Sequence, residues 1–320
     1  LSLALWDWGT ASSKLPDHAL GLPAQGVQRV RIPLPTRWQS KLGPLGMHPG
    51  RLMRPLDGFH RIQPDRPWLG QLPFTSAVVE LPTPGSPAQA RLRRDLESAQ
   101  AVLVFSRAVA ARVPGELGVE PQKVVQVPVG ADHWWRDLGE RQPAPKPQVV
   151  VLGALRKARR IETLLAGMQA YWSQGGVLDL CLLGTLTGDV PGIERAWQTG
   201  PNASKIRHAL PPEAELPSWV AASHGLLHLA VDEGSPVTPL EAVRLGVHPV
   251  LESLPAFREA FAQLPGAAPI WLERDPQPEA IAAALFALEA RPRAEPLACP
   301  EFTWEASARA HAAAWKRCFA

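Results

Sequence analysis

Two carboxylates, Glu233 and Glu241, stand on either side of a Gly-Ser-Pro turn in the stretch DEGSPVTPLEAVRLG, residues 232–246. Carboxylate oxygens accept hydrogen bonds from neighbouring hydroxyl groups, such as those of a sugar or a ribose ring. The letters TPLE are also typical of a helix start, with Thr238 as N-cap, Pro239 as the first helical residue and Glu241 completing a capping box. Glu241 is therefore a capping residue, a ligand-binding carboxylate, or both, whereas Glu233 has no comparable structural role.

The same stretch is also suited to binding phosphate. The first N–H groups of a helix are unpaired and lie at the positive end of its dipole, which attracts anions. Gly234 and Ser235 let a ligand approach the backbone closely. Because the apolar run GLLHLA ends just before Asp232, Glu233 is expected at the carboxyl end of a buried strand. The sequence thus predicts a hydroxyl-binding carboxylate beside a phosphate site.

The elements that must position these residues alternate between strands and helices, which predicts right-handed parallel units in two doubly wound sheets. Ligands of such sheets bind beyond the carboxyl ends of the strands. The predicted strands span residues 1–5, 26–32, 76–81, 101–105, 123–127, 148–153, 177–184, 225–230, 247–252 and 269–272, and the predicted helices 88–98, 106–113, 161–172, 216–222, 238–245, 256–264 and 279–290.

Composition narrows the class of protein. The chain has 320 residues, 46% hydrophobic and 20% charged, which is a globular composition large enough for two domains. No apolar window approaches the ~18–20 residues of a membrane span, and no leader sequence is evident, so we expect a cytoplasmic protein. Three cysteines without ligand spacing argue against a disulfide framework or a metal site.

The charge of the chain is nearly balanced, with a formal net charge of +3, so nucleic acid is not an expected partner. Basic residues are nevertheless concentrated in the N-terminal part. They form either a solvated face or a surface for an anionic partner or a peripheral membrane contact. These residues are Arg29, Arg31, Arg37, Lys41, Arg51, Arg54, Arg61 and Arg66.

Several segments, taken in order, resemble the motifs of retaining glycosyltransferases of the GT-B fold, in particular family 4. DEGSPVTPLEAVRLG resembles the E-x7-E signature of that family, and VVLGALRKARRIETLLAGM its donor loop. AQAVLVFSRAVAARVPGELGVEPQKVVQVPVGAD resembles its strand, Ser-capped helix and interdomain segment, and EFTWEASARAHAAAWKRC its terminal helix. The similarity covers roughly residues 99–320.

This resemblance implies an α/β, GT-B-like fold with two doubly wound Rossmann-like domains, a deep interdomain cleft and a C-terminal helix that crosses back to the first domain. The implied domains are an acceptor-side domain at residues 1–140, a nucleotide-sugar donor domain at 141–302 and a crossover helix at 303–320. The implied activity is transfer of a hexose-type sugar, with retention, from a UDP- or GDP-sugar to a saccharide, lipid or protein acceptor. No metal or other cofactor is obligatory.

The resemblance also implies roles for particular residues. Glu233 is expected to hold the donor sugar near its reacting carbon, Arg159 to bind the diphosphate and Glu241 to hold the ribose. Arg156 either replaces an arginine that the family usually has at the place of Ala154, or belongs to a solvated run of charges. The remaining expected donor-binding residues are Gly153, Gly234, Ser235 and Thr238.

The first domain departs from the family pattern, which keeps other functions open. Gly9-Thr10-Ala11 stands where the family has a Gly-Gly phosphate loop, and Glu80 stands near the place of its active-site histidine. One alternative is a catalytically degenerate binding or scaffold protein that pairs with an active glycosyltransferase. Another is a nucleotide-sugar epimerase of the same fold.

Other classes of enzyme find less support in the sequence. No G-x-G-x-x-G opens either domain and no G-x-S-x-G follows a strand, so a dinucleotide-dependent reductase and a serine hydrolase are disfavoured. The histidines have no metal-ligand spacing. We expect His133 to be a surface or structural residue, and His224 and His228 to pack on one face of a strand.

Overall fold

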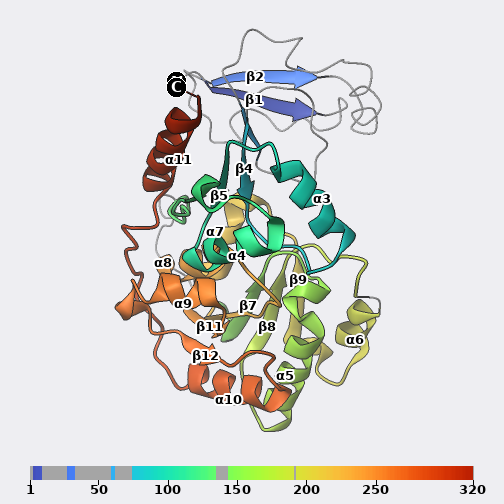
Figure 1. Cartoon of the computed structure of the whole chain (residues 1–320). Helices are drawn as coiled ribbons and strands as arrows, with labels where there is room; N and C mark the ends of the chain where they lie inside the picture. The colour runs from blue at the N-terminus through green and yellow to red at the C-terminus, as the bar shows by residue number, and fades with distance from the viewer. Residues whose placement is uncertain are drawn as a thin grey trace.

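The computed structural model of the protein describes residues 3–8, 27–32, 59–61, 74–134, 143–190 and 192–319. The described strands form three sheets in which every strand pair is parallel. Two of these sheets are covered by helices and succeed one another along the chain, as the colours of Figure 1 show. The alternating pattern of the sequence therefore predicted the architecture correctly.

The first helix-covered sheet has the strand order β3-β4-β5-β6. Its elements are β3 (Phe59–Arg61), β4 (Phe74–Val78), α3 (Pro87–Leu96), β5 (Ala101–Val104), α4 (Arg107–Leu117), the 3-10 helix η4 (Pro121–Lys123) and β6 (Val124–Gln126). The strands expected near the N-terminus are present as β1 (Leu3–Trp8) and β2 (Val27–Ile32). These two strands pair with each other in a separate sheet.

The second helix-covered sheet has the order β12-β11-β10-β7-β8-β9. Its first half contains β7 (Gln148–Leu152), η6 (Lys157–Arg159), α5 (Ile161–Ser173), β8 (Asp179–Leu183), α6 (Ile193–Thr199), η7 (Ala203–Lys205) and β9 (Ile206–Ala209). Its second half contains η8 (Glu213–Glu215), α7 (Leu216–Ala221), β10 (Gly225–His228), α8 (Val237–Arg244), β11 (His248–Glu252), α9 (Pro255–Phe261), η9 (Pro265–Ala267), β12 (Ile270–Leu272) and α10 (Pro278–Glu289).

This strand order is that of a doubly wound nucleotide-binding fold. Successive strands are added on one side of β7 up to β9 and then on its other side from β10, so the strand order reverses between β7 and β10 while all strands stay parallel. The two strands are paired, with Gly225 opposite Val149 and Leu226 opposite Val150. Ligands of such sheets bind at the reversal, beyond the carboxyl ends of the two strands. The chain segments that follow β7 and β10 are therefore the first place to look for a site.

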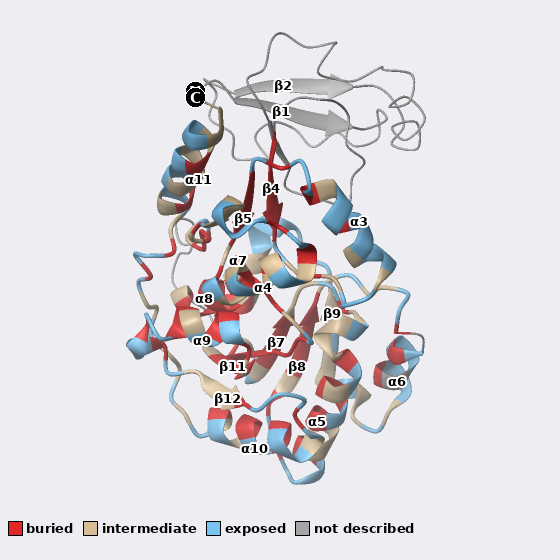
Figure 2. Ribbon diagram, in the orientation of Figure 1, coloured by how far each residue is buried: buried red, intermediate tan, exposed pale blue. Residues whose placement is uncertain are grey.

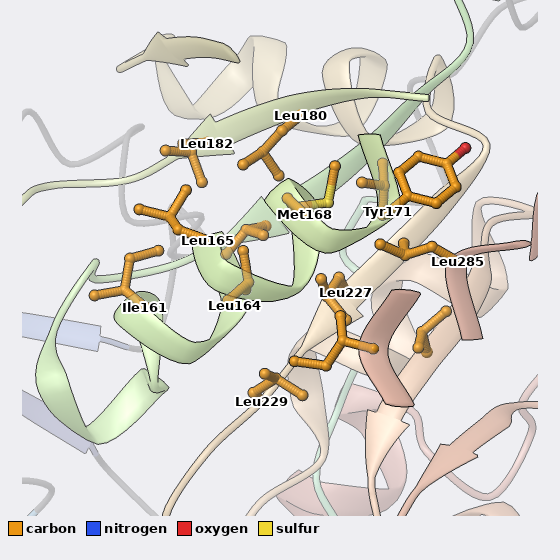
Figure 3. Close-up of a cluster of buried hydrophobic side chains, with 14 of the residues drawn as sticks. Ile161, Leu164, Leu165, Met168, Tyr171, Leu180, Leu182, Leu227, Leu229 and Leu285 are labelled. Atoms are coloured by element: carbon orange, nitrogen blue, oxygen red, sulfur yellow. The ribbon is translucent and has the colours of Figure 1, made fainter. Parts of the chain in front are cut away.

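Apolar side chains cover both faces of the second sheet. Successive residues of a strand point to opposite faces, so neighbouring residues of β7 belong to different cores. Val149 and Val151 point into one core with α5 and α10, whereas Val150 belongs to the core on the opposite face. Figure 3 shows the first of these cores, where Leu164 and Met168 of α5 meet strand residues such as Leu180. Figure 2 shows the same pattern for the whole molecule, with buried strands and helices exposed on their outer sides.

The terminal helix α11 (Trp304–Phe319) crosses back to the first sheet, as expected. Ala314 packs with Ala101 and Leu103 of β5 in one hydrophobic cluster, and α11 lies beside that sheet in Figure 1. The crossing is fixed at its start, because Trp304 lies against Gly130: a Cβ at Gly130 would be 2.4 Å from Trp304 Cδ2. The exact domain limits proposed above, residues 1–140, 141–302 and 303–320, remain predictions.

Both ends of α4 follow from the local sequence. Ser106 caps α4 as predicted, with Oγ accepting from the Val109 N–H at 3.3 Å. The helix continues beyond the predicted end at Val113, through Pro114 to Leu117, since Val113 and Leu117 are both buried. It ends at Gly118, which has a left-handed conformation.

Some elements had no clear sequence signal. The strands β3 and β9 and the helix α6 are short, and none of them was predicted. Strand β4 begins and ends earlier than the predicted range 76–81, and β8 is shorter than the predicted range 177–184. Gly9-Thr10-Ala11 lies outside the described residues, as do the side chains of the basic residues between Arg29 and Arg66.

Candidate functional site

The loop that follows β7 begins at Gly153, one of the predicted donor-binding residues. Its φ of 112° lies in the region that favours glycine, and its N–H donates to the Leu183 carbonyl at 2.9 Å. A Cβ at Gly153 would meet no described atom within 4 Å. Ala154, the next residue, is exposed. The chain thus turns at the strand end without filling the space beside it.

The same loop then places three arginines around η6. Arg160 has a φ of 50° and donates through Nε to Glu252 Oε2 at 3.0 Å. Glu252 is fully buried and also accepts from the Ala230 N–H, at 3.2 Å. The Val231 N–H donates to the Ala158 carbonyl at 2.9 Å. These contacts, which the sequence did not reveal, tie the loop after β7 to the segment after β10.

Glu233 lies where the two segments meet. Its side chain is only 6% exposed, and Oε2 accepts a hydrogen bond from Nη1 of Arg159. His228 Nε2 lies 3.5 Å from the same oxygen. Burial alone would raise the pKa of Glu233, but the neighbouring His228 and the Arg159 guanidinium hold that pKa below its usual value. The two residues expected to do chemistry are therefore in direct contact, and the carboxylate is ionised.

His228 is a site residue that the sequence reasoning assigned to packing alone. Its ring does pack edge-on against Phe257, with centroids 5.3 Å apart, but Nε2 also contacts Nη1 of Arg159. Burial and the Arg159 charge lower the pKa of His228, although Glu233 opposes them. His228 Nε2 therefore contacts both members of the Arg159–Glu233 pair. A histidine at the carboxyl end of a buried apolar strand was the available signal.

Glu241 occupies the next part of the stretch, within α8. The predicted capping box is wrong: α8 begins at Val237, Pro236 takes the N-cap place, and no side chain caps the helix. Pro239 therefore lies within the first turn, where its missing N–H costs nothing. Glu241 is buried instead, with Oε1 3.3 Å from Nε2 of His133. Burial and the nearby Glu213 carboxylate raise the pKa of Glu241 to about 8.

Three further predicted donor-binding residues, Gly234, Ser235 and Thr238, lie between the two glutamates. Gly234 and Ser235 are buried, and Thr238 is half-buried in the first turn of α8. A Cβ at Gly234 would be 2.0 Å from the Val79 carbonyl oxygen, in the chain that follows β4. Only glycine fits at this position, and its contact brings the first sheet against the candidate site.

Arg156 makes a second connection to the chain after β4. Its Nη2 donates to both carboxylate oxygens of Glu80, at 2.8 and 2.9 Å. Its Nε is buried and has no hydrogen-bond partner among the described residues. Arg156 is therefore not a freely solvated charge, and among the described residues its buried Nε is an unpaired donor.

Within the described ranges, no group of three or more His, Cys, Asp or Glu side chains is arranged to hold a metal ion. Cys181 and Cys299 are buried thiols and Cys318 is half-buried. In the same part of the chain, no helix is long and apolar enough to cross a bilayer.

Comparisons with known proteins agree with this architecture. No protein-family model and no curated protein matches the sequence. Among solved structures, WaaG, a glycosyltransferase involved in lipopolysaccharide biosynthesis, is similar over 92% of this chain and 84% of its own, with a TM-score of 0.63 and 12% identity. A glycosyltransferase from Rickettsia africae is similar over 92% of this chain and 81% of its own, with a TM-score of 0.58 and 10% identity.

Larger enzymes share the fold too. Sucrose-phosphate synthase from Thermosynechococcus elongatus has a TM-score of 0.54 at 16% identity over 78% of this chain. TarM has a TM-score of 0.55 at 10% identity over 84% of this chain. The chain spans 64% of the first protein's length and 53% of the second's. At these identities the likeness establishes the fold.

The molecule is therefore an α/β protein with the GT-B fold of glycosyltransferases, as its motifs predicted. Two helix-covered parallel sheets and a terminal helix that returns to the first sheet make up this fold. The predicted site residues gather at the end of the second sheet that such a fold uses for ligands.

Proposed function

We propose that this protein is a retaining glycosyltransferase that moves a hexose-type sugar from a UDP- or GDP-sugar to a saccharide, lipid or protein acceptor, without an obligatory metal. One observation carries the proposal: Glu233 is a buried, ionised carboxylate in direct contact with Arg159 at the reversal point of the second sheet. Such a pair offers a negative charge and a positive charge side by side, out of bulk water.

The chemistry of glycosyl transfer needs that pair of charges. The acceptor oxygen forms a bond to the anomeric carbon of the sugar, and the bond from that carbon to the diphosphate oxygen breaks. The electron pair leaves with the diphosphate, and the proton of the acceptor hydroxyl passes to it. Arg159 stabilises the growing negative charge, and Glu233 the sugar ring as it becomes oxocarbenium-like. One well-placed donor of this kind lowers a barrier by ~3–4 kcal/mol.

Arg156 supplies a second positive charge in this proposal. Its buried Nε lacks a partner among the residues that the structure describes, and a diphosphate oxygen would satisfy it. Gly153 leaves open space beside the backbone at the end of β7, and Thr238 lies in the first turn of α8, at the positive end of its dipole. Glu241 would hold the ribose hydroxyls, once it has lost the proton that burial favours.

The test is a transfer assay with the whole chain. Purified protein is incubated with UDP- and GDP-hexoses in EDTA, and release of the nucleoside diphosphate is followed together with the anomeric configuration of the product. Release of one nucleotide, lost in a Glu233→Ala variant and giving the donor's own anomer, supports the proposal. Equal release by Glu233→Ala contradicts the role of Glu233, an inverted product contradicts retention, and activity seen only with added metal contradicts metal independence.

A second candidate is a binding or scaffold protein with the same fold and no turnover. The contact that favours it is between Gly234 and the Val79 carbonyl, together with the ion pair of Arg156 and Glu80, because both bring the first sheet close to the sugar-binding position. In the same assay, a scaffold would bind a nucleotide or a partner glycosyltransferase and release nothing from any donor.

A further inference from the structure

Helix α4, on the first sheet, reaches across to the segment that carries Glu233. Nη1 of Arg112 donates to both carboxylate oxygens of Asp232, at 3.0 and 2.8 Å. Asp232 Oδ1 in turn accepts from the backbone N–H of Glu233, at 3.0 Å. One continuous chain of hydrogen bonds therefore runs from a helix of the first domain to the backbone of Glu233.

The guanidinium of Arg112 is itself held in place from two sides. Its Nε donates to Glu116 at 2.7 Å, one turn further along α4, and its Nη1 is taken up by Asp232. Arg112 has a planar fork of donors, so a side chain bound at both ends has little freedom left to rotate. The direction of the Asp232 carboxylate is set by this fork.

Helix α4 is also fixed against the second domain at its N-terminus. Glu259 of α9 accepts from the N–H groups of Arg107 and Ala108, at 3.0 and 3.2 Å. A carboxylate at this place pairs two N–H groups that the helix cannot pair itself and interacts favourably with the helix dipole. The second domain therefore contacts α4 at two places, through Glu259 at the first turn and through Asp232 at Arg112.

We propose that Arg112 is a positioning residue, which acts through Asp232 to hold the Glu233 segment in place from the side of the first domain. The inference rests on the proposed function, since it gives the first domain a part in orienting the residue that faces the sugar. Asp232 is the intermediate, because its carboxylate binds the guanidinium and the Glu233 N–H at the same time.

The pair is too exposed to act through stability. The side chains of Arg112 and Asp232 are 38% and 32% exposed, and ion pairs of this kind add little to the free energy of unfolding. Small displacements of a reacting group, by contrast, are expensive for catalysis. Loss of Arg112 should therefore change turnover while the fold and the affinity for nucleotide remain.

The experiment compares variants of the full chain with the donor found by the transfer assay. Arg112→Ala and Asp232→Ala should each lower kcat about tenfold, with the Kd for the free nucleoside diphosphate changed less than about twofold. Asp232→Asn keeps an oxygen for the Glu233 N–H and should lose less than Asp232→Ala. The matched control is Arg309→Ala, which breaks an exposed ion pair with Glu305 on α11 and should leave kcat unchanged.

A second readout is independent of turnover. Hydrogen exchange of the Glu233 amide, followed by NMR, should be faster in both Arg112→Ala and Asp232→Ala and unchanged in Arg309→Ala. Full kcat and unchanged exchange in Arg112→Ala overturn the inference. A fall in kcat accompanied by an equal loss of nucleotide affinity also overturns it, because the effect would then be on binding.

The two proposals fail in different ways. If the wild-type chain turns over no donor, the proposed function is wrong, and with it any catalytic part for Arg112. The exchange rates then show only whether the hydrogen-bond chain exists. If the wild type is active and Arg112→Ala is equally active, the positioning role alone is wrong.

Discussion

Arg156 and Glu80 form an ion pair that joins the two sheets of the molecule, with Nη2 of Arg156 2.8 and 2.9 Å from the carboxylate oxygens. The arginine belongs to the loop after β7, and the glutamate follows β4. A diphosphate that binds the unpaired Nε of Arg156 would compete with Glu80 for the positive charge of the same guanidinium. The pair therefore links occupation of the donor site to the contact between the domains.

This competition predicts that Glu80→Gln strengthens nucleotide binding. Both side chains of the pair are about a third exposed, so the pair is worth at most about 1 kcal/mol, and the Kd for UDP or GDP should fall about two- to fivefold. Titration calorimetry measures the change. Glu120→Gln, which breaks an exposed ion pair with Lys123, is the control and should have no effect. Weaker binding by Glu80→Gln would show that Glu80 supports the site.

The contact between Arg159 and Glu233 predicts the pH dependence of turnover. Activity requires the Glu233 carboxylate, so it is lost as the pH falls through the pKa of that residue, which lies below its ordinary value of 4.5. Arg159→Ala removes a neighbouring charge, should lower kcat about 10²–10³-fold, and should move the acidic limb of the profile upward. Arg159→Lys keeps a positive charge, so its kcat should lie between those of the wild type and Arg159→Ala. If the acidic limb of the pH profile were at the same pH in Arg159→Ala as in the wild type, Arg159 would have no effect on the pKa of Glu233, which would contradict this account.

Burial of Glu241 predicts a cost in stability at neutral and alkaline pH. Its pKa in the folded chain is about 8, above the ordinary 4.5, so the folded protein binds a proton that the unfolded chain does not. The contribution to stability is complete below about pH 4.5 and is lost as the pH rises through about 8. Glu241→Gln should raise the Tm at pH 8 by about 3 °C and flatten the fall between pH 5 and 8. Parallel curves for the two proteins would contradict the buried, protonated carboxyl group.

The ion pair of Arg160 and Glu252 is buried, so its loss should be costly. Removing the guanidinium leaves a fully buried carboxylate without its main partner, which costs about 3 kcal/mol in the free energy of unfolding. Arg160→Gly removes the guanidinium without adding backbone strain, since glycine accepts the φ of 50°. Arg309→Ala breaks an exposed pair with Glu305 and should cost less than about 0.5 kcal/mol in urea unfolding. Similar losses in the two variants would contradict this account.

The sequence predicted the parts of the fold that depend on repeating patterns. Buried strands such as β7 and β10 were found because apolar runs of this length are typical of parallel sheets. The family motifs placed Glu233, Arg159 and Glu241 in one region, and the structure brings their segments together. Strands β3 (FHR) and β9 (IRHA) were missed because a histidine and an arginine interrupt each of them, so neither has the apolar run of the strands that were predicted.

The parts of the site that the sequence did not predict depend on contacts between residues that are far apart in the sequence. Arg112 and Asp232 are 120 residues apart, and Arg156 and Glu80 are 76 apart, so no local spacing relates them. His228 looked like a packing residue because its neighbours in the strand are all apolar. The start of α8 was misplaced by two residues because the pattern TPLE fits a capping box, whereas Glu241 is buried near His133.

The central claim, that the end of the second sheet binds a nucleotide sugar, is tested most directly by thermal unfolding of the purified chain with UDP, GDP, ADP and their sugar conjugates in EDTA. A nucleotide at one hundred times its Kd adds about 2.7 kcal/mol to the free energy of unfolding. The account predicts that one of them raises the Tm by several degrees, and that Glu241→Ala and Arg159→Ala each abolish the rise. No rise with any nucleotide, or an equal rise in both variants, would contradict it.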